Sequence, residues 1–365
     1  MKEICIIYNF DQKYREGIYS LIERHYSCHW VFGKNETDIK GIENGVLNDV
    51  KRVKNKTFGP LYYQEGVPAL LDRYDCILML GELFCVSTWM MLLKKKTFCR
   101  EKKIYLWSHG WYGREGFLKK WLKKWFFGMA DSVFLYGQYA KDVAIKQGYK
   151  KNNLIVIHNS LDYEKQLKLR QSNLRSGIYE EHFHNDAPVL LFIGRLTKVK
   201  HLDLLIEAVA SLREKGYKYN LVFVGDGEER EHLENLVNNR SLTDVTWFYG
   251  SCYSEEQNAP LIFNADLCVS PGNVGLTAMH SMVYGTPVLT HNDFAFQMPE
   301  FEAIHPMRTG NFFKRDDVEA LTLAIMNWFG APDYDRQKIR QACYDEIDAE
   351  WTPTFQFDKI TKTIQ

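Results

Sequence analysis

Short apolar runs alternate with amphipathic helical stretches along the whole chain, and this alternation limits the possible folds more than any other feature. The strand candidates of the first half are EICIIYN, DCILMLG, KIYLWSHG, SVFLYG and LIVIHN. Those of the second half are VLLFIG, YNLVFVG, VTWFYG, DLCVSP and TPVLT. Strands that alternate with helices are typical of parallel sheets with helices on both faces. We therefore expect an α/β protein with two Rossmann-like halves.

A polar stretch interrupts this alternation and divides the 365 residues, which are enough for two domains. We expect one Rossmann-like domain at 1–165, a linker at 166–186 and a second Rossmann-like domain at 187–346. Residues 347–365 are expected to form a helix that packs across the domain junction. Because open α/β sheets bind ligands beyond the carboxyl ends of their strands, the two domains should face each other across a ligand-binding cleft.

The eight cysteines are scattered, and several lie inside apolar strand-like runs. This pattern is typical of reduced, buried thiols in a cytoplasmic protein rather than of disulfides or a zinc site. The first residues, MKEICIIYNF, form too short an apolar run for a signal peptide and are interpreted as a strand. No run approaches the roughly 18 apolar residues that would span a bilayer.

Charge is unevenly distributed, although 46 Lys and Arg balance 46 Asp and Glu over the whole chain. Residues 1–165 contain 27 basic and 18 acidic residues, and the remainder contains 19 and 28. This asymmetry indicates that the first half faces something anionic, unless the surface charge merely drifts.

The stretch GFLKKWLKKWFFG, at 116–128, is the clearest surface signal in the first half. At helical spacing, its two faces consist of Phe117, Leu118, Trp121, Leu122 and Trp125 on one side and Lys119, Lys120, Lys123 and Lys124 on the other. Such a helix suits an anionic membrane surface. The residues expected to face the membrane are Lys119, Lys120, Trp121, Lys123, Lys124 and Trp125. The alternative is an ordinary helix with its apolar face on the sheet and solvated lysines.

The segment LLFIGRLTKVKHLDLLIEAV has the character of a diphosphate site. A strand ends at Gly194, and Arg195 and Lys200 follow just before a helix. Two cations and the free backbone N–H groups of a helix N-terminus together favour an anionic ligand. Further along the chain, SPGNVGLTAMHSMVYGTP is interpreted as a strand end, a Gly-rich turn and a helix that could hold a ligand.

These segments resemble the GT-B glycosyltransferases of family four, which are retaining enzymes that use nucleotide sugars. The resemblance is carried by Gly-Arg-Leu, Lys and the DLLIEA helix, then NLVFVGDGEEREHLENLV, VTWFYGSCYSEEQNAPLIFNADLCVSP and MPEFEAI…RTGNFF. It covers nearly all of 188–330. Over 1–165 it is weaker and rests on WSHGW, ADSVFLYG and VIHNSLD. The implied fold is GT-B.

One departure from the family concerns a pair of glutamates separated by seven residues in the donor-sugar loop. Here the two positions fall on Gly272 and His280. A neutral His280 can still bond a ribose hydroxyl, and Gly272 would let backbone N–H groups reach the sugar or phosphate. Asn273 or Thr277 could supply the missing hydrogen bonds.

The resemblance implies a donor site with the residues Gly194, Arg195, Lys200, Gly225, Gly227, Tyr253, Asn273, Gly275, Leu276, Thr277, His280 and Glu302. Glu302 is placed there by its spacing from Thr309-Gly310, although Asp293, Glu300 and Glu302 could equally cap the following helix. His109, at the carboxyl end of a strand, is expected near the transferred sugar and forms the catalytic set with Arg195 and Lys200.

Acceptor or cleft candidates in the first half are Asn9, Arg15, Glu16 and Glu82. They follow the strands EICIIYN and DCILMLG. Either Glu16 or Glu82 could accept the proton of the acceptor hydroxyl.

The resemblance implies a retaining glycosyltransferase that moves a sugar from a nucleotide-diphosphate sugar, with UDP favoured, to a glycan hydroxyl. The expected acceptor is lipid-linked, in bacterial capsule or O-antigen synthesis, and the expected location is the cytoplasmic face of the membrane. Arg195 and Lys200 would stabilise the leaving diphosphate, so no metal or other cofactor is expected.

Two alternatives remain open. A non-catalytic sugar-nucleotide-binding subunit is favoured by the lost glutamates, whereas Arg195, Lys200 and His109 count against it. A GT-B-fold sugar-nucleotide epimerase would need carboxylate pairs that residues 270–280 lack. No nucleic-acid partner is expected, because the lysines concentrate on one helix and no recognition motif is present.

Overall fold

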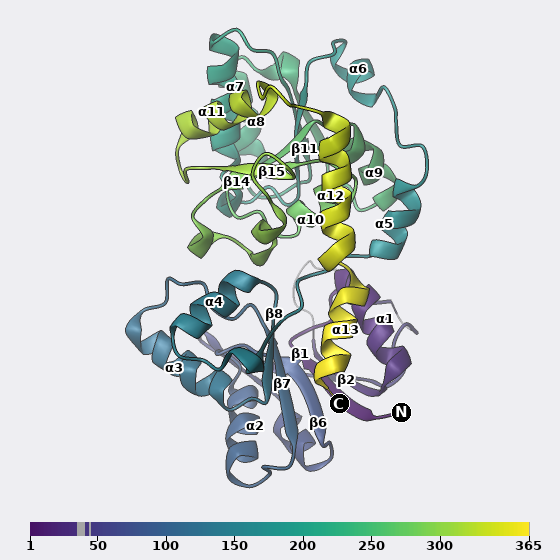
Figure 1. The fold of residues 1–365 in the computed structure, drawn as a ribbon, viewed down its shortest axis with the longest axis vertical. Coiled ribbons are helices and arrows are strands. Elements are labelled where there is room, and N and C mark those ends of the chain that lie inside the picture. Colours follow the sequence, from purple (N-terminus) through teal and green to yellow (C-terminus); the bar gives the residue numbers. More distant parts are fainter. Residues whose placement is uncertain (35–40, 44, 365) are drawn as a thin grey trace. The chain divides into compact units, whose positions relative to one another are not determined.

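The computed structural model describes residues 1–34, 41–43 and 45–364, and the chain divides into two compact units. Unit 1 consists of Met1–Asp162 and Thr352–Gln365, and unit 2 consists of Tyr163–Trp351. The chain thus passes from unit 1 to unit 2 and returns to unit 1 at its C-terminal end, drawn in yellow in Figure 1.

Unit 1 is built on a seven-stranded sheet in the order β3-β2-β1-β6-β7-β8-β9, with every neighbouring pair parallel. The strands are β1 (Glu3–Tyr8), β2 (Ser27–Gly33), β3 (Val50–Val53), β6 (Cys76–Leu80), β7 (Lys103–Ser108), β8 (Ser132–Leu135) and β9 (Leu154–Val156). A separate antiparallel hairpin is formed by β4 (Asn55–Phe58) and β5 (Leu61–Gln64). The central strands are almost continuously apolar because both faces of the sheet are covered.

Helices cover both faces of this sheet, and a hydrophobic core lies on each side. One core includes residues of α2 (Val86–Thr97), α3 (Phe117–Gly128) and α4 (Gln138–Lys146), with η2 (Val67–Asp72). The other includes residues of α1 (Glu16–His25) and of the C-terminal α13 (Pro353–Thr363), which pack against each other. Short 3-10 turns lie at η1 (Lys13–Arg15) and η3 (Lys151–Asn153).

Unit 2 is built on a six-stranded parallel sheet in the order β12-β11-β10-β13-β14-β15. Its strands are β10 (Val189–Ile193), β11 (Asn220–Val224), β12 (Thr246–Gly250), β13 (Leu267–Ser270), β14 (Val288–His291) and β15 (Gly310–Phe313). Its helices are α5 (Tyr163–Arg170), α6 (Ile178–Phe183), α7 (Leu202–Glu214), α8 (Arg230–Asn239), α9 (Glu255–Asn264), α10 (Thr277–Met282), α11 (Val318–Phe329) and α12 (Arg336–Glu350). The 3-10 turns are η4 (Lys198–Lys200), η5 (Thr243–Val245), η6 (Phe294–Phe296) and η7 (Pro299–Ala303).

Two segments differ from the predicted domain boundaries. The stretch 166–186, predicted as a linker, lies within unit 2 and carries most of α5 and all of α6. It is docked there because Tyr179 is buried and its hydroxyl donates to the carbonyl of Leu261 on α9, 2.6 Å away.

The predicted C-terminal helix at 347–365 is divided in two. The first helix, α12, ends at Glu350 in unit 2, and α13 begins at Pro353 in unit 1. Proline cannot continue a helix but suits its first turn, and the Thr352 hydroxyl caps α13 by accepting from the N–H of Phe355.

Three further observations concern the whole described chain. Among the described residues, no helix combines the length and apolar character needed to cross a bilayer. All eight cysteines carry free thiols, and five of them are buried. Between the described residues, no cluster of three His, Cys, Asp or Glu side chains could hold a metal ion.

Candidate active site

The carboxyl edge of the unit 2 sheet brings the predicted donor residues together. From β10 the chain winds to β11 and β12 on one side, and from β13 it winds to β14 and β15 on the other. The order of strands therefore reverses between β10 and β13, which is the crevice where open α/β sheets bind ligands. The loop 194–200 leaves β10 and the loop 271–276 leaves β13, so the two loops form the two sides of this crevice.

Glycines allow three backbone segments to touch at this edge. A Cβ atom on Gly225 would lie 1.9 Å from the carbonyl oxygen of Gly194. A Cβ atom on Gly272 would lie 2.1 Å from the carbonyl oxygen of Val199. The N–H of Gly272 donates to the carbonyl of Lys200. Gly272 therefore lets the two loops pack closely. The sequence suggested that backbone N–H groups here reach the ligand, but the N–H of Gly272 is hydrogen-bonded to Lys200 within the protein.

Lys200 links the two sides of the crevice. Its Nζ donates to the backbone oxygen of Asn273 at 2.6 Å and to the Asn273 side-chain oxygen at 2.9 Å. Burial lowers the pKa of Lys200 to about 8, with Glu300 opposing this shift and Arg195 adding to it. Arg195 itself is exposed. The site thus holds one partly buried and one exposed cation at the end of β10.

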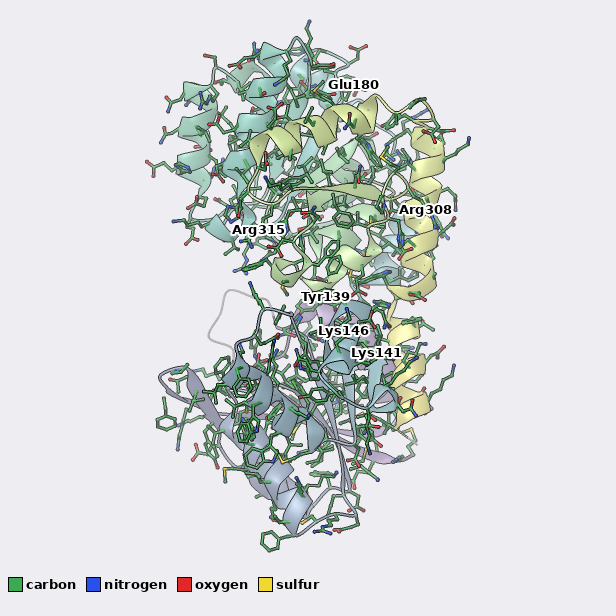
Figure 2. All side chains as sticks on the ribbon, turned by 60° about the vertical axis from the view of Figure 1, so that its left-hand side comes forward. Tyr139, Lys141, Lys146, Glu180, Arg308 and Arg315 are labelled. Atoms are coloured by element: carbon green, nitrogen blue, oxygen red, sulfur yellow. The ribbon has the colours of Figure 1, made fainter. Side chains whose placement is uncertain are left out.

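The segment between β14 and β15 supports the same turn. The Gln297 side chain accepts from the N–H of Val274 at 2.9 Å and donates to the hydroxyl of Thr290 at 2.8 Å. Arg315, labelled in Figure 2, pairs with Asp293 at 3.2 Å and lies over the ring of Phe296. Of the two glutamates in η7, Glu300 is buried and its charge acts on Lys200, whereas the predicted Glu302 is only partly buried.

A carboxylate that the sequence did not reveal stands beside His280. The His280 Nε2 atom lies 3.0 and 3.1 Å from the two carboxylate oxygens of Glu255, the first residue of α9. The Tyr284 hydroxyl and the Gln166 side chain also donate to Glu255, at 2.7 and 2.9 Å. Burial alone would raise the pKa of Glu255, but the charge of His280 and these hydrogen bonds lower it to about 2.

The remaining donor candidates lie on the same loops. Gly275 has a φ of 53°, Leu276 precedes α10, and the buried Thr277 hydroxyl donates to the carbonyl of Ile193 at 3.0 Å. Tyr253, in the loop after β12, is 80% exposed. Gly227 follows β11 beside the Leu196 backbone.

In unit 1, the structure brings His109 and Arg15 into one cluster. His109 follows β7, and its ring centroid lies 4.7 Å from that of Tyr136, which accepts a hydrogen bond from Arg15 Nη2. Burial, with a smaller effect of the Arg15 charge, lowers the pKa of His109 to about 4, so its imidazole is neutral at physiological pH. The adjoining loop is held by Tyr139 on α4, labelled in Figure 2, whose hydroxyl donates to the carbonyl of Tyr112.

The other acceptor candidates have separate contacts. Glu82 accepts a hydrogen bond from the Tyr62 hydroxyl at 2.7 Å, and burial raises the pKa of Glu82. Glu16 pairs with Lys13 at 2.8 Å. The Asn9 side chain accepts from the N–H of Phe10, so it caps its own loop.

The helix α3 corrects one prediction. Lys123, predicted to face the membrane, is buried: its Nζ donates to the carbonyl of Gly110 and pairs with the buried carboxylate of Glu115 at 2.6 Å. It shares the inner face of α3 with Phe126 and Phe127. The outer surface exposes four apolar side chains, Phe117 (88%), Leu118 (68%), Trp121 (55%) and Trp125 (43%). The alternative from the sequence is an ordinary helix whose apolar face packs on the sheet. For these four residues that alternative is wrong.

Comparison with known protein families places unit 2 near one family of transferases. Residues 178–345, which cover most of unit 2, match the family model of the group 1 glycosyl transferases. The resemblance predicted from the motifs is confirmed for this part of the chain, which is similar to the group 1 glycosyl transferases.

Curated relatives match parts of the chain. It is 30% identical over 121 residues to the alpha-D-kanosaminyltransferase of Streptomyces kanamyceticus, covering 32% of this chain and 31% of the relative. It is 26% identical over 186 residues to an uncharacterized 41.2 kDa protein in the cps region of Klebsiella pneumoniae, covering 48% of each. The matches thus span between about a third and a half of these relatives' length.

Solved structures match the whole chain. Anabaena Alr3699/HepE in complex with UDP has a TM-score of 0.76 at 15% identity, covering 100% of this chain and 99% of that one. The lipopolysaccharide outer core galactosyltransferase WaaB has a TM-score of 0.73 at 13% identity, covering 99% of each. The fold is that of the GT-B glycosyltransferases, and the predicted α/β class with two Rossmann-like halves is confirmed.

Proposed function

We propose that this protein is a retaining glycosyltransferase that uses a nucleotide-diphosphate sugar, with UDP as the favoured nucleotide. The observation that carries the proposal is the pair Arg195 and Lys200 at the reversal of strand order in a group 1 glycosyl transferase domain. A diphosphate fits this place because a partly buried ammonium and an exposed guanidinium both lie in the loop that follows β10.

In the proposed reaction, the bond between the anomeric carbon and the diphosphate oxygen breaks while an acceptor hydroxyl attacks the same face of the sugar. The hydroxyl proton passes to the departing phosphate oxygen. Arg195 and Lys200 stabilise the negative charge that develops on the diphosphate, which is the largest electrostatic demand of the step. Since two cations meet this demand, we propose that transfer needs no metal ion.

The nucleoside is proposed to lie near His280. Its imidazole is oriented by Glu255, Tyr284 and Gln166, and a ring nitrogen fixed in this way can bond a ribose hydroxyl. The neutral His109 of unit 1 is proposed to contact the transferred sugar.

The acceptor is proposed to be a lipid-linked glycan of a bacterial surface polysaccharide, reached by docking of unit 1 on the anionic inner face of the membrane. The exposed apolar side chains of α3 and its exposed lysines Lys119, Lys120 and Lys124 support this. A relative encoded in a Klebsiella cps region supports the capsule assignment.

The test begins with thermal unfolding of the full chain in the presence of UDP, GDP, ADP or CMP and their sugar conjugates, with EDTA and then with Mg²⁺. A nucleotide that binds the native state raises the unfolding temperature by mass action. We expect a shift with UDP that survives EDTA and is lost in Lys200→Met. Lys198→Met, an exposed lysine of the same 3-10 turn, is the matched control.

Sugar analysis then separates the possible activities. Transfer to a prenyl-diphosphate-linked sugar with an unchanged anomeric configuration supports the proposal. Binding without turnover indicates a non-catalytic subunit, and a changed sugar stereocentre without any acceptor indicates an epimerase. A nucleotide shift that persists in Lys200→Met contradicts the proposed diphosphate site.

A further inference from the structure

The side chain of Arg15 in unit 1 is a buried cation with no acidic partner among the described residues. Only 5% of Arg15 is exposed. Its guanidinium carbon lies between 5.1 and 5.4 Å from the ring centroids of four aromatic side chains, Tyr8, Tyr14, Trp107 and Tyr136. Its Nε donates to the side-chain oxygen of Gln12 and its Nη2 to the hydroxyl of Tyr136. Both of these partners are uncharged.

Three buried groups of this cluster lack a hydrogen-bond partner in the described part of the chain, and one of them is the Tyr8 hydroxyl. The other two are the Arg15 Nη1 and Trp107 Nε1 atoms. Both groups can only donate. Buried donors are almost always paired, because an unpaired donor has lost its hydrogen bonds to water without a replacement. Adjacent unpaired donors beside an unneutralised cation indicate that an acceptor with negative charge belongs here.

The nearby carboxylates do not neutralise Arg15. Asp11 accepts two hydrogen bonds from Arg52 and one from the N–H of Ile42. Glu82 accepts from Tyr62, and its burial disfavours the charged form. Glu16 pairs with Lys13. Buried charges are usually paired, so an isolated arginine in an aromatic cluster points to a ligand.

Arg15 also lies at a position in the sheet where ligands typically bind. From β1 the chain winds to β2 and β3, and from β6 it winds to β7, β8 and β9, so strand order reverses between β1 and β6. Arg15 follows β1 at the carboxyl edge of this reversal, as Lys200 follows β10 in unit 2. Tyr14, a half-buried side chain on the short turn η1, also lies beside the guanidinium.

We propose that Arg15 binds an oxyanion at a second anion site, which lies within unit 1. The oxyanion is a phosphoryl group of a substrate. The phosphoryl oxygens would accept from Arg15 Nη1 and Trp107 Nε1 and neutralise the guanidinium. Planar guanidinium groups suit phosphate because they can donate two parallel hydrogen bonds. The site stands on unit 1 alone; only the naming of its ligand as a substrate rests on the proposed glycosyl transfer.

The test removes the unit 2 site first. In the full chain carrying Arg195→Met and Lys200→Met, we expect calorimetry to detect one remaining site for inorganic pyrophosphate. Adding Arg15→Met should weaken its affinity at least tenfold. Arg24→Gln, which changes an exposed arginine of the helix α1 that follows Arg15, should leave the affinity unchanged. Absence of pyrophosphate binding in the parent, or equal affinity with Arg15→Met, would overturn the proposal.

Stability distinguishes a receptor from a structural arginine. If Arg15 binds an anion, Arg15→Met should leave the unfolding temperature unchanged or raise it, because an unneutralised buried cation is removed. If Arg15 only holds unit 1 together, the unfolding temperature should fall and the proposal fails. Circular dichroism of each variant checks that it is folded.

Competition identifies the source of the phosphoryl group. Displacement of pyrophosphate by farnesyl phosphate, but not by UDP, assigns the site to the lipid acceptor, and the reverse assigns it to the donor. If neither displaces pyrophosphate, the substrate assignment is overturned. Failure of this anion site can be distinguished from failure of the proposed function, because UDP binding to the unaltered protein is measured separately.

Discussion

At the scale of single residues, the environment of Lys200 makes its charge depend on pH in an accessible range. Burial places the pKa of Lys200 at about 8, so in the free protein the ammonium loses its proton as the pH rises through that value. Binding of a diphosphate to the neutral amine would then require uptake of a proton.

We therefore expect UDP affinity to fall as the pH rises from 7 to 9.5, by at most about tenfold per pH unit above the pKa of Lys200. Calorimetric titration at several pH values measures this. In Lys200→Arg the decline should disappear, because arginine stays charged throughout. An equally steep decline in Lys200→Arg would assign the pH dependence to another group.

The carboxylate of Glu255 gives a second prediction at this scale. The pKa of Glu255 in the folded protein is about 2, below its ordinary value of 4.5. The stabilisation from its contacts is therefore fully present above pH 4.5 and is lost as the pH falls toward 2. Glu255→Gln should destabilise unit 2 at pH 7 by on the order of 1–3 kcal/mol.

Denaturant unfolding of the parent and of Glu255→Gln at pH 7 and at pH 3 measures the difference. The difference in the free energy of unfolding between the parent and Glu255→Gln should be smaller at pH 3 than at pH 7. The control is Glu231→Gln, which changes an exposed carboxylate on α8 of the same unit and should have a small effect at pH 7. A gap of equal size at both pH values would show that the charge of Glu255 is not what stabilises the contacts.

At the scale of elements, α3 combines a buried ion pair with an exposed apolar surface. On its inner face Lys123 forms an ion pair with Glu115, and on its outer face Phe117 and Trp121 are largely exposed. Trp125 is less exposed and packs on Trp89 of α2, with ring centroids 5.7 Å apart. Phe117 and Trp121 are thus the residues to change when membrane docking is tested without disturbing the core.

The double variant Phe117→Glu and Trp121→Glu should bind anionic liposomes at least tenfold more weakly than the parent, because it removes buried apolar area and adds repulsion. Sedimentation with vesicles containing phosphatidylglycerol measures this. Tyr217→Glu changes a side chain of unit 2 that is 43% exposed and should bind like the parent. Equal sedimentation of the double variant and the parent would refute docking through α3.

At the scale of the whole molecule, the returning C-terminal segment makes unit 1 discontinuous in sequence. Residues Ile360 and Ile364 of this segment are buried in the same core as Ile18, Tyr19 and Ile22 of α1. The stability of unit 1 therefore depends on a helix that all of unit 2, Tyr163–Trp351, separates along the chain from the rest of unit 1.

Ile360→Ala should destabilise unit 1 by about 2–5 kcal/mol, through lost burial and the cavity it leaves. Hydrogen exchange followed by mass spectrometry, resolved by segment, should show faster exchange in α1, β1 and β2 but not in β10, β11 and α7. Asp358→Ala, at an exposed position of the same helix, is the control. Faster exchange spread evenly over both units would contradict this division.

Much of the fold follows from local patterns in the sequence. Near-continuous apolar runs such as VLLFI and KIYLWS are typical of strands buried on both faces, and the helical stretches between them favour parallel connections. The cations at the end of β10 were also predictable, because Gly194, Arg195 and Lys200 follow a strand and precede a helix within one short segment. The less apolar β2, β3 and the hairpin β4–β5 carry weaker signals and were not predicted.

The contacts that define the candidate sites were decided by the tertiary structure. Periodicity placed Lys123 on a solvated face, but a carboxylate eight residues earlier in a loop reaches it and makes its burial possible. Glu255 meets His280 from another helix, and Arg15 meets Trp107 of β7 and Tyr136, which follows β8. A sequence pattern determines which side chains leave a strand or helix together, because it reports local spacing. It does not determine which charges meet, because those partners are brought together only when the sheet is assembled.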